Sequence, residues 1–341
     1  MQGLPDVINT VEELDEMLSR PTPPLIELMK GLDGDVMILG AGGKIGPTMA
    51  RTAKRAVQAA GVKKEIVAVD VVELPKLAAE GIKTIRCDML DLAAVDKLPR
   101  VPNIIYMIGR KFGSTGSEHL TWAINVIVAY HAARAFTRSR IVAFSTGCVY
   151  PVMHVMTGGP TELTPCNPIG EYAMSCLGRE RMFDQFAETA GEKVLQFRLN
   201  YAVELRYGVL FDVATKVAAG EPIDLTTGYV NVIWQGDACN EALRCLALAE
   251  SPARVLNVTG PETICVRRVA ERFGRLFGKE PVFAGQENGM GYLSDATEAN
   301  GLFGNPTVPA GKVIEWIAHW LTIGGENLGK PTHFETQDGN Y

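Results

Sequence analysis

Three glycines recur at three-residue spacing in the segment VMILGAGGKIG, at Gly40, Gly43 and Gly46. The apolar residues before them predict a β-strand, and the residues after them predict a helix. Glycine allows a tight turn and a close approach of the backbone to a ligand, and the first amides of a helix bind anions. The pattern therefore predicts a binding site for a pyrophosphate.

Asp70 ends the next predicted strand, EIVAVD. At this distance from the glycines, a carboxylate can accept hydrogen bonds from both hydroxyls of an adenosine ribose, and it repels a 2′-phosphate. The two signals together favour NAD over NADP as a ligand. The structural alternative is a glycine turn followed by an aspartate that caps its strand.

Tyr172 lies in the first turn of a predicted helix, and Cys176 follows it on the same helix face. A tyrosine hydroxyl can transfer a proton, but it titrates near pH 10, so it acts as a base near neutrality only with help. Cys176 gives little help, because a neutral thiol is a weak donor without charge. Thr146 ends another predicted strand, where its hydroxyl can hold a reacting oxygen or cap the following loop.

Three outcomes follow from the cysteine. In the first, a cation from elsewhere acts on Tyr172: Arg179 lies on the same helix face, and Arg110 and Lys111 follow the predicted strand NIIYMIG. In the second, Tyr172 only donates a hydrogen bond in a slower reaction. In the third, the site binds its ligand without turnover. Cys176 would itself act as a nucleophile only if a base such as histidine approached it.

The elements that must position these residues alternate along the chain. Short runs rich in β-branched residues are separated by helical segments, which predicts an α/β protein with a doubly wound parallel sheet. The seven predicted strands are DVMILG, EIVAVD, KTIRCD, NIIYMIG, RIVAFS, KVLQFRL and ARVLNVT. In the N-terminal segment, Thr10 and Glu13 predict a capping box at the start of a helix.

The composition suggests one large domain with inserted segments that form a smaller one. We expect an N-terminal helical arm, a dinucleotide-binding domain, a C-terminal substrate subdomain and a polar tail on the surface or at a subunit contact. Their predicted bounds are 1–33 for the arm, 34–200 with about 231–258 for the first domain, about 201–230 with 259–325 for the subdomain, and 326–341 for the tail.

The chain resembles the extended short-chain dehydrogenase/reductase family, the NAD-dependent epimerase/dehydratase group, from residue 35 to about residue 283. The glycine spacing is similar to that of the family, and FSTGCVYP and EYAMSCLGRERM resemble its SSxxVYG and YxxSKxxxE motifs. CDMLDL, NVIVAYHAARAF and VNVIWQGDACNEAL resemble three further family segments. The sequence departs from the family at Cys176, where the second motif has lysine.

The resemblance implies a Rossmann fold and assigns roles to residues of this chain. Tyr172 and Thr146 fall at the catalytic positions, with Cys176, Arg179 and Lys111 as further catalytic candidates. Asn200, Tyr201 and Arg206 are the substrate-binding candidates. The expected cofactor-binding residues are Gly40, Gly43, Lys44, Ile45, Gly46, Asp70, Asp88, Met89, Leu90, Ile108, Gly109 and Asn125.

The function implied by the resemblance is that of an NAD-dependent sugar epimerase or dehydrogenase that works through a keto-sugar. Gly147 and Cys148 follow Thr146 where the 4,6-dehydratase branch has an acidic pair, and this counts against dehydration. The alternative is a non-catalytic NAD-binding protein that senses redox state or scaffolds an assembly. A homodimer is expected from the family.

The bulk composition excludes several classes of protein. The formal net charge is −6 and no block of lysine or arginine occurs, which argues against a general nucleic-acid surface. The seven cysteines form no CxxC pair and match no zinc pattern, so we expect reduced thiols and no metal site. The sequence has no secretory signal and no apolar run of about 20 residues, so we expect a cytoplasmic protein outside the membrane.

Overall fold

A parallel seven-stranded sheet organises the larger lobe of the protein. The computed structural model describes residues 3–339. The strand order is β12-β7-β5-β4-β1-β2-β3, and every pairing within this sheet is parallel. All seven strands predicted from the sequence are therefore confirmed. Their bounds are β1 (Val36–Leu39), β2 (Ile66–Asp70), β3 (Lys83–Arg86), β4 (Asn103–Tyr106), β5 (Arg140–Thr146), β7 (Lys193–Leu199) and β12 (Arg254–Val258).

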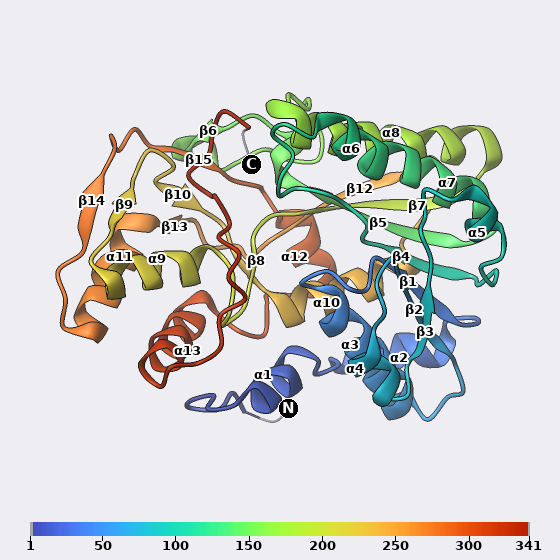
Figure 1. Cartoon of the computed structure of the whole chain (residues 1–341), viewed down its shortest axis with the longest axis horizontal. Helices are drawn as coiled ribbons and strands as arrows, with labels where there is room; N and C mark the ends of the chain where they lie inside the picture. Colours follow the sequence, from blue (N-terminus) through green and yellow to red (C-terminus); the bar gives the residue numbers. More distant parts are fainter. Residues whose placement is uncertain (1–2, 340–341) are drawn as a thin grey trace.

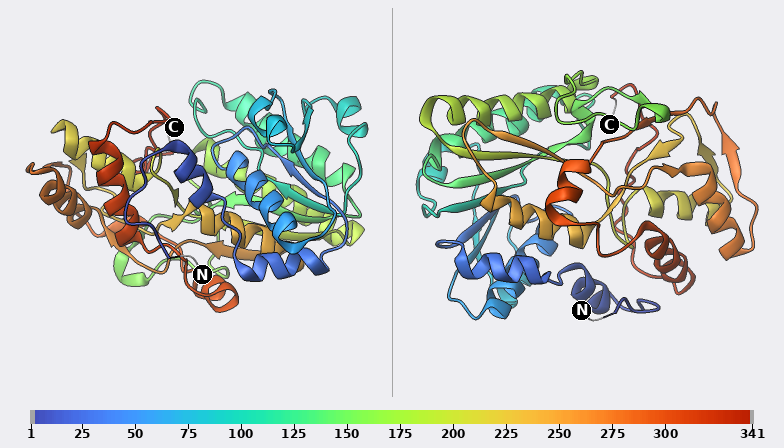
Figure 2. Two further views of the ribbon diagram at one scale, coloured as in Figure 1. Left: turned by 90° about the horizontal axis from the view of Figure 1, so that it is seen from below. Right: turned by 180° about the vertical axis from the view of Figure 1, so that it is seen from behind.

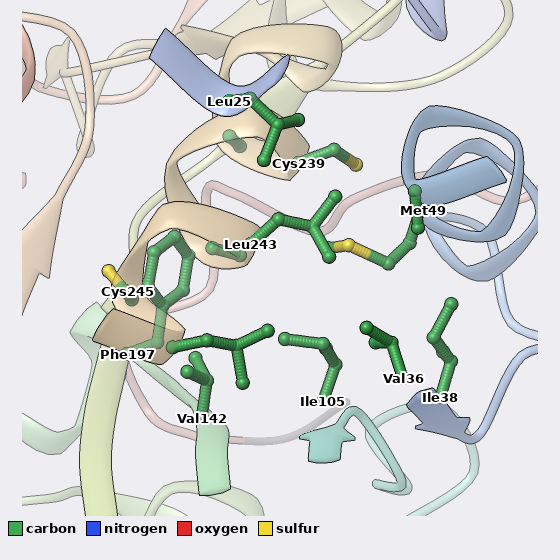
Figure 3. Close-up of a cluster of buried hydrophobic side chains, with 14 of the residues drawn as sticks. Leu25, Val36, Ile38, Met49, Ile105, Val142, Phe197, Cys239, Leu243 and Cys245 are labelled. Carbon is green, nitrogen blue, oxygen red and sulfur yellow. The ribbon is translucent and has the colours of Figure 1, made fainter. Parts of the chain in front are cut away.

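Helices cover both faces of this sheet, as predicted (Figure 1). On one face, α2 (Pro23–Gly31), α3 (Gly46–Ala60) and α10 (Gln235–Arg244) pack their apolar side chains on the strands. Figure 3 shows this core, in which Met49 and Leu243 point toward Ile105 and Val142 of the sheet. The other face is covered by α5 (Leu92–Asp96), α7 (Val128–Ala135) and α8 (Gly170–Ala190).

The chain direction around β1 predicts where a ligand binds. β1 pairs with β2 on one side and β4 on the other, so the connections diverge to opposite halves of the sheet at its carboxyl end. In open parallel sheets, ligands bind in the crevice at this switch point. The glycine turn follows β1 and therefore lies in this crevice.

A smaller lobe is built from later segments of the chain and has its own hydrophobic core. Figure 1 shows it beside the large sheet, with short strands and helices α9, α11 and α13. Its helices are α9 (Val209–Ala219), α11 (Val266–Phe277) and α13 (Ala310–Thr322). Its strands are β6 (Met153–His154), β10 (Tyr229–Val230), β13 (Ile264–Cys265) and β15 (Met290–Tyr292) in one sheet, and β9 (Pro222–Asp224) and β14 (Val282–Ala284) in another.

Short elements complete the chain. β8 (Ala202–Val203) and β11 (Ile233–Trp234) form a parallel pair, and α12 (Thr297–Phe303) contacts β12. The remaining elements are α4 (Pro75–Ala79), α6 (Glu118–Trp122), the π-helical η1 (Ala123–Ile127) and the 3-10 segments η2 (Gly147–Val149), η3 (Val155–Thr157) and η4 (Cys245–Ala247). Within residues 3–339, no helix is long and apolar enough to cross a membrane.

The N-terminal segment contacts both lobes. α1 (Val11–Leu18) places Leu14 and Leu18 in the core of the smaller lobe, whereas α2 packs on the large sheet. Figure 2 shows this blue segment passing from one lobe to the other. The predicted helix start is confirmed, because the Glu13 amide donates to the side chain of the N-cap Thr10 at 3.1 Å. The other half of the capping box differs, since Glu13 Oε2 accepts from the Asn9 amide at 2.7 Å and not from the Thr10 amide.

The C-terminal tail crosses between the two lobes. In Figure 1 its red trace runs from α13 past α9 toward β6. Thr332 and Phe334 are buried, with 2% and 1% of their surface exposed. Among residues 326–339 only Thr332, Phe334 and Gly339 are buried, so the tail lies partly on the surface, as expected, and partly inside the protein. The amide and the hydroxyl of Thr332 both donate hydrogen bonds to Asp212 Oδ2, at 2.7 and 2.6 Å. The polar composition of the tail did not predict this buried contact.

Candidate active site

Two cavities meet at the glycine turn. The Asp70 cavity has a volume of about 510 Å³, and the Tyr172 cavity has a volume of about 430 Å³. Both are lined by Gly40, Gly43 and Lys111, so together they form one continuous site around the turn. Of the residues expected to form the site, Gly109 also lines both cavities. Those that line only the Asp70 cavity are Asp70, Asp88, Met89, Leu90 and Ile108. Those that line only the Tyr172 cavity are Lys44, Ile45, Gly46, Thr146, Tyr172, Arg179, Asn200 and Tyr201.

Two of the three glycines of the turn, Gly40 and Gly46, are required by its geometry. Gly40 has a φ of +89°, and a Cβ atom there would lie 2.9 Å from the backbone nitrogen of Ile108. At Gly46, the first residue of α3, a Cβ atom would lie 2.3 Å from the Ala41 carbonyl oxygen. The turn thus brings the start of α3 close to β1, where its amides can receive a pyrophosphate.

The carboxylates of the Asp70 cavity follow β2 and β3. Asp70 accepts hydrogen bonds from the Gly42 amide at 2.7 Å and the Val72 amide at 3.2 Å. Asp88 accepts one from the Leu90 amide at 2.9 Å. These bonds fix both carboxylates at the edge of the cavity, while each keeps acceptor capacity for a ribose hydroxyl or an adenine amino group. The residues present therefore fit the adenosine half of NAD.

Tyr172 and Thr146 meet in the other cavity. Tyr172 comes from the first turn of α8 and lines this cavity together with Thr146, which ends β5. Thr146 Oγ1 accepts a hydrogen bond from the Cys148 amide at 3.1 Å, so it caps its loop. Burial, together with Cys176 and Cys148, raises the pKa of Tyr172 well above 10, while Arg179 and Thr146 act in the opposite direction.

Cys176 lies beneath the tyrosine rather than in the cavity. Its side chain is fully buried against Val149 and Tyr150, and it makes a hydrogen-bond contact with Tyr172. Burial raises the pKa of its thiol, so the group is a neutral thiol near pH 7. This environment does not produce the thiolate that a nucleophile requires. No cluster of His, Cys, Asp and Glu suited to a metal occurs among residues 3–339.

Two of the predicted cations reach the Tyr172 cavity. Arg179 has 5% of its surface exposed and donates from Nη1 to the Ile108 carbonyl at 3.1 Å. Lys111 Nζ lies 5.7 Å from the centre of the Tyr172 ring and donates to the Thr332 carbonyl at 3.1 Å. Burial lowers the pKa of Lys111. Arg110 lines only the Asp70 cavity, where its Nη2 donates to the Gly113 carbonyl at 2.9 Å.

Asn125 connects the two sides of the site without lining either cavity. It lies in the π-helical segment η1, a local distortion that is often found near functional sites. Its Oδ1 accepts from the Arg110 amide at 2.7 Å, and its Nδ2 donates to Ser175 Oγ at 2.8 Å. Ser175 in turn donates to the Tyr172 carbonyl at 2.8 Å. The position supports a structural link between the loop after β4 and α8 rather than the expected contact with the cofactor.

The three substrate-binding candidates separate in space. Asn200 and Tyr201 line the Tyr172 cavity, and Tyr201 has a φ of 42°, which is rare for a non-glycine residue and common near functional sites. Arg206 lines neither cavity. Its guanidinium is held by Glu204 Oε2 at 3.0 Å and Asp15 Oδ1 at 3.2 Å, so its position does not support the expected substrate contact.

A buried ion pair supports the base of the site. Glu180 accepts from Arg198 Nη2 at 2.6 Å and from Nε at 2.9 Å, which joins α8 to β7. Ser145, the residue before Thr146, donates to the same carboxylate. The bidentate pair therefore fixes α8, which carries Tyr172, relative to β5, which carries Thr146.

Several lining residues were not predicted. Phe112, Tyr207, Lys330 and Thr332 line the Tyr172 cavity beside the expected residues. Phe112 follows β4, whereas Tyr207 precedes α9 and the other two belong to the tail. No spacing rule connects segments so distant in sequence, and a lysine in a polar tail is typical of an exposed surface.

The fold and the site together define a dinucleotide-binding α/β protein with a tyrosine that lines its second cavity. Residues 36–229 match the profile of the NAD dependent epimerase/dehydratase family. This match spans more than half of the chain, so the protein belongs to that family, and NAD is its cofactor. No curated protein shows significant sequence similarity to the chain.

Solved structures of sugar-nucleotide enzymes share the fold. MoeE5 in complex with UDP-glucose and NAD has 20% identity and a TM-score of 0.69, over 85% of this chain and 99% of that one. UDP-glucose 4-epimerase of Thermus thermophilus with NAD has 18% identity and a TM-score of 0.69, over 84% and 98%. DesIV, a dTDP-glucose 4,6-dehydratase of Streptomyces venezuelae, has 17% identity and a TM-score of 0.70, over 84% and 97%.

Proposed function

We propose that the protein is an NAD-dependent epimerase or dehydrogenase that acts on a sugar derivative through a keto intermediate. The observation that carries this proposal is that Tyr172 and Thr146 line one cavity that begins at the glycine turn. A hydroxyl pair at this place can bind a sugar hydroxyl and move its proton. Similar folds in proteins whose structures contain UDP-glucose and NAD support the choice of a sugar.

The residues of the chain divide the work between the two cavities. The glycine turn and the start of α3 would hold the pyrophosphate, and Asp70 and Asp88 would hold the adenosine half. NAD, when bound, supplies a hydride acceptor. Tyr172 takes or returns the hydroxyl proton, and Thr146 holds the reacting oxygen.

Arg179 and Lys111 supply the positive charge that Cys176 lacks. Arg179 keeps its charge at every physiological pH and acts to lower the pKa of Tyr172. Lys111 approaches the ring from the opposite element, after β4. Burial, Cys176 and Cys148 raise the pKa of Tyr172, whereas Arg179 and Thr146 lower it. Lys111, with its ammonium 5.7 Å from the ring centre, would add to the effect of Arg179.

Elimination of water is disfavoured at this site. Gly147 and Cys148 form the 3-10 turn directly after Thr146, and neither can serve as the acid that protonates a leaving hydroxyl. The sequence around Thr146 therefore supports an epimerase or dehydrogenase over a 4,6-dehydratase.

We further propose that the protein is a cytoplasmic homodimer. Exposed apolar side chains gather on the helices that cover one face of the sheet, and a self-complementary surface of this kind is typical of twofold dimers. Four of them on α6, η1, α7 and α8 are Trp122, Ile127, Tyr130 and Met174.

The test is reduction of NAD during incubation with sugars, sugar acids, sugar phosphates and nucleotide sugars, together with isomer analysis of the sugar. We expect turnover with one class of sugar and at least a hundredfold loss of kcat in Tyr172→Phe. Unchanged kcat in that variant would overturn the assignment of Tyr172. NAD that binds without turnover on any substrate would favour the non-catalytic alternative.

A further inference from the structure

A lysine of the glycine turn, Lys44, lines the Tyr172 cavity, and its ammonium group lies over an aromatic ring. Lys44 Nζ lies 3.2 Å from the centre of the Tyr207 ring and 4.5 Å from that of Phe112. The atom is buried, and no hydrogen-bond acceptor contacts it within residues 3–339. Cation–π contacts offset part of the cost of burying the charge, but they do not replace an acceptor.

Two further lysines line the same cavity. Lys111 Nζ lies 5.7 Å from the Phe112 ring centre, so Phe112 contacts the ammonium groups of both Lys44 and Lys111. Lys330 reaches the cavity from the tail. Burial, followed by the charges of Lys111 and Lys330, lowers the pKa of Lys44 to about 7.

The cavity has little negative charge of its own to balance the lysines. Asp212 on α9 is the acidic group that acts on Lys44 and raises its pKa. Asp212 Oδ2 already accepts two hydrogen bonds from Thr332, and the Lys44 ammonium donates none to it. The three lysines therefore bring an excess of positive charge to a cavity in which Lys44 and Lys111 are partly buried and Lys330 is exposed, and this excess favours an anion there.

The position of the lysines indicates which ligand carries this anion. Neither Lys44 nor Lys330 lines the Asp70 cavity. Lys44 starts in the glycine turn, but its ammonium lies on Tyr207, in the segment that leads into α9 of the smaller lobe. Lys111 lies beside Tyr172, the proposed proton-transfer residue. An anion bound by all three would therefore lie close to the reacting carbon of the sugar.

We propose that Lys44, Lys111 and Lys330 form a binding site for a carboxylate or phosphate group on the sugar itself, so that the substrate is a sugar acid or a sugar phosphate. This inference rests on the proposed function, because it places the anion in the substrate half of the site. The C-terminal tail then completes the site by contributing Lys330.

Anion binding at this site takes up protons. The groups that face Lys44 are Lys111, Lys330, Asp212 and the Tyr207 ring. Without an anion, the pKa of Lys44 of about 7 leaves it largely neutral at pH 8. A bound carboxylate raises this pKa, so the affinity falls as the pH rises above 7.

The test is calorimetric titration of NAD-loaded protein with glucuronate, with glucose 6-phosphate and, as a neutral control, with glucose. We expect at least one of the anionic sugars to bind at least tenfold more tightly than glucose, with proton uptake at pH 8 visible as a dependence of the heat on the buffer. Lys330→Gln should lower the affinity for the anionic sugar about tenfold and the affinity for NAD less than twofold. Lys97→Gln, at an exposed position, should change neither affinity.

Two outcomes would overturn the inference. One is equal affinity for glucose and both anionic sugars. The other is a tenfold loss of NAD affinity in Lys330→Gln and Lys44→Met, which would assign the lysines to the pyrophosphate of the cofactor. If the protein bound no NAD, the proposed function would fail separately. Inorganic phosphate titrated into the cofactor-free protein would then test the lysine site, with weaker binding in Lys330→Gln supporting it and no binding refuting it.

Discussion

The Lys111 ammonium lies 5.7 Å from the centre of the Tyr172 ring, although the two residues come from different elements. Lys111 follows β4, whereas Tyr172 lies in the first turn of α8. At about 5 Å and an effective dielectric near 20, a unit charge favours a phenolate by roughly 3 kcal/mol. A lysine from another part of the fold can thus act on the tyrosine where its own helix carries a cysteine.

Replacement of Lys111 by methionine should slow the reaction by about tenfold to a hundredfold, which corresponds to roughly 1.4 to 2.7 kcal/mol. Loss of a nearby cation disfavours the phenolate and raises the pKa of Tyr172, so the rise of kcat with pH should move to higher pH. The measurement is the pH profile of kcat, with Lys97→Gln as the control. An unchanged profile in Lys111→Met would assign the effect to Arg179 alone.

A lysine at position 176, as in the YxxSKxxxE motif of the family, should destabilise the fold of this chain. Cys176 is fully buried beside Arg179, so Cys176→Lys would place a second positive charge in a site that water does not reach. We expect a loss of unfolding free energy on the order of 3 kcal/mol in urea. The loss should be smaller when Arg179→Leu removes the competing charge. Equal losses in both backgrounds would show that the two positions are not coupled.

Fold and site differ in how far the sequence could predict them. The strands and the Asp70 cavity follow from local rules, because β-branched runs, glycine spacing and a strand-ending carboxylate lie within single βα units. Lys44 was expected to bind the cofactor, yet its ammonium contacts Tyr207 of another segment. That contact depends on how distant segments pack and has no local signature in the sequence. The same holds for the contact of Thr332 in the tail with Asp212 on α9.

Glu192 should make the protein less stable as the pH rises. Its carboxyl group is buried, neither oxygen has a hydrogen-bond partner within residues 3–339, and burial raises its pKa from 4.5 to about 8. Between these two values the unfolded chain loses the proton more readily than the folded one, so stability is full below pH 4.5 and falls toward pH 8. Glu192→Gln should therefore stabilise the protein at pH 8 by on the order of 2–3 kcal/mol.

The check is urea denaturation of wild type and Glu192→Gln at pH 5 and pH 8. The variant should gain stability only at the higher pH, because glutamine removes the cost of ionising the group. A gain of the same size at both pH values would assign the effect to packing rather than to charge.

The central claim is that a dinucleotide rests on the glycine turn with its ribose at Asp70. Its most direct measurement is calorimetric titration of NAD and NADP into wild type and Asp70→Ser. We predict one NAD site per chain and at least tenfold weaker binding of NADP to the wild type. In Asp70→Ser the difference in affinity between NAD and NADP should be smaller, because the variant lacks the carboxylate that repels the 2′-phosphate. If neither NAD nor NADP gave any heat of binding, the assignment of the glycine turn as a dinucleotide site would be contradicted.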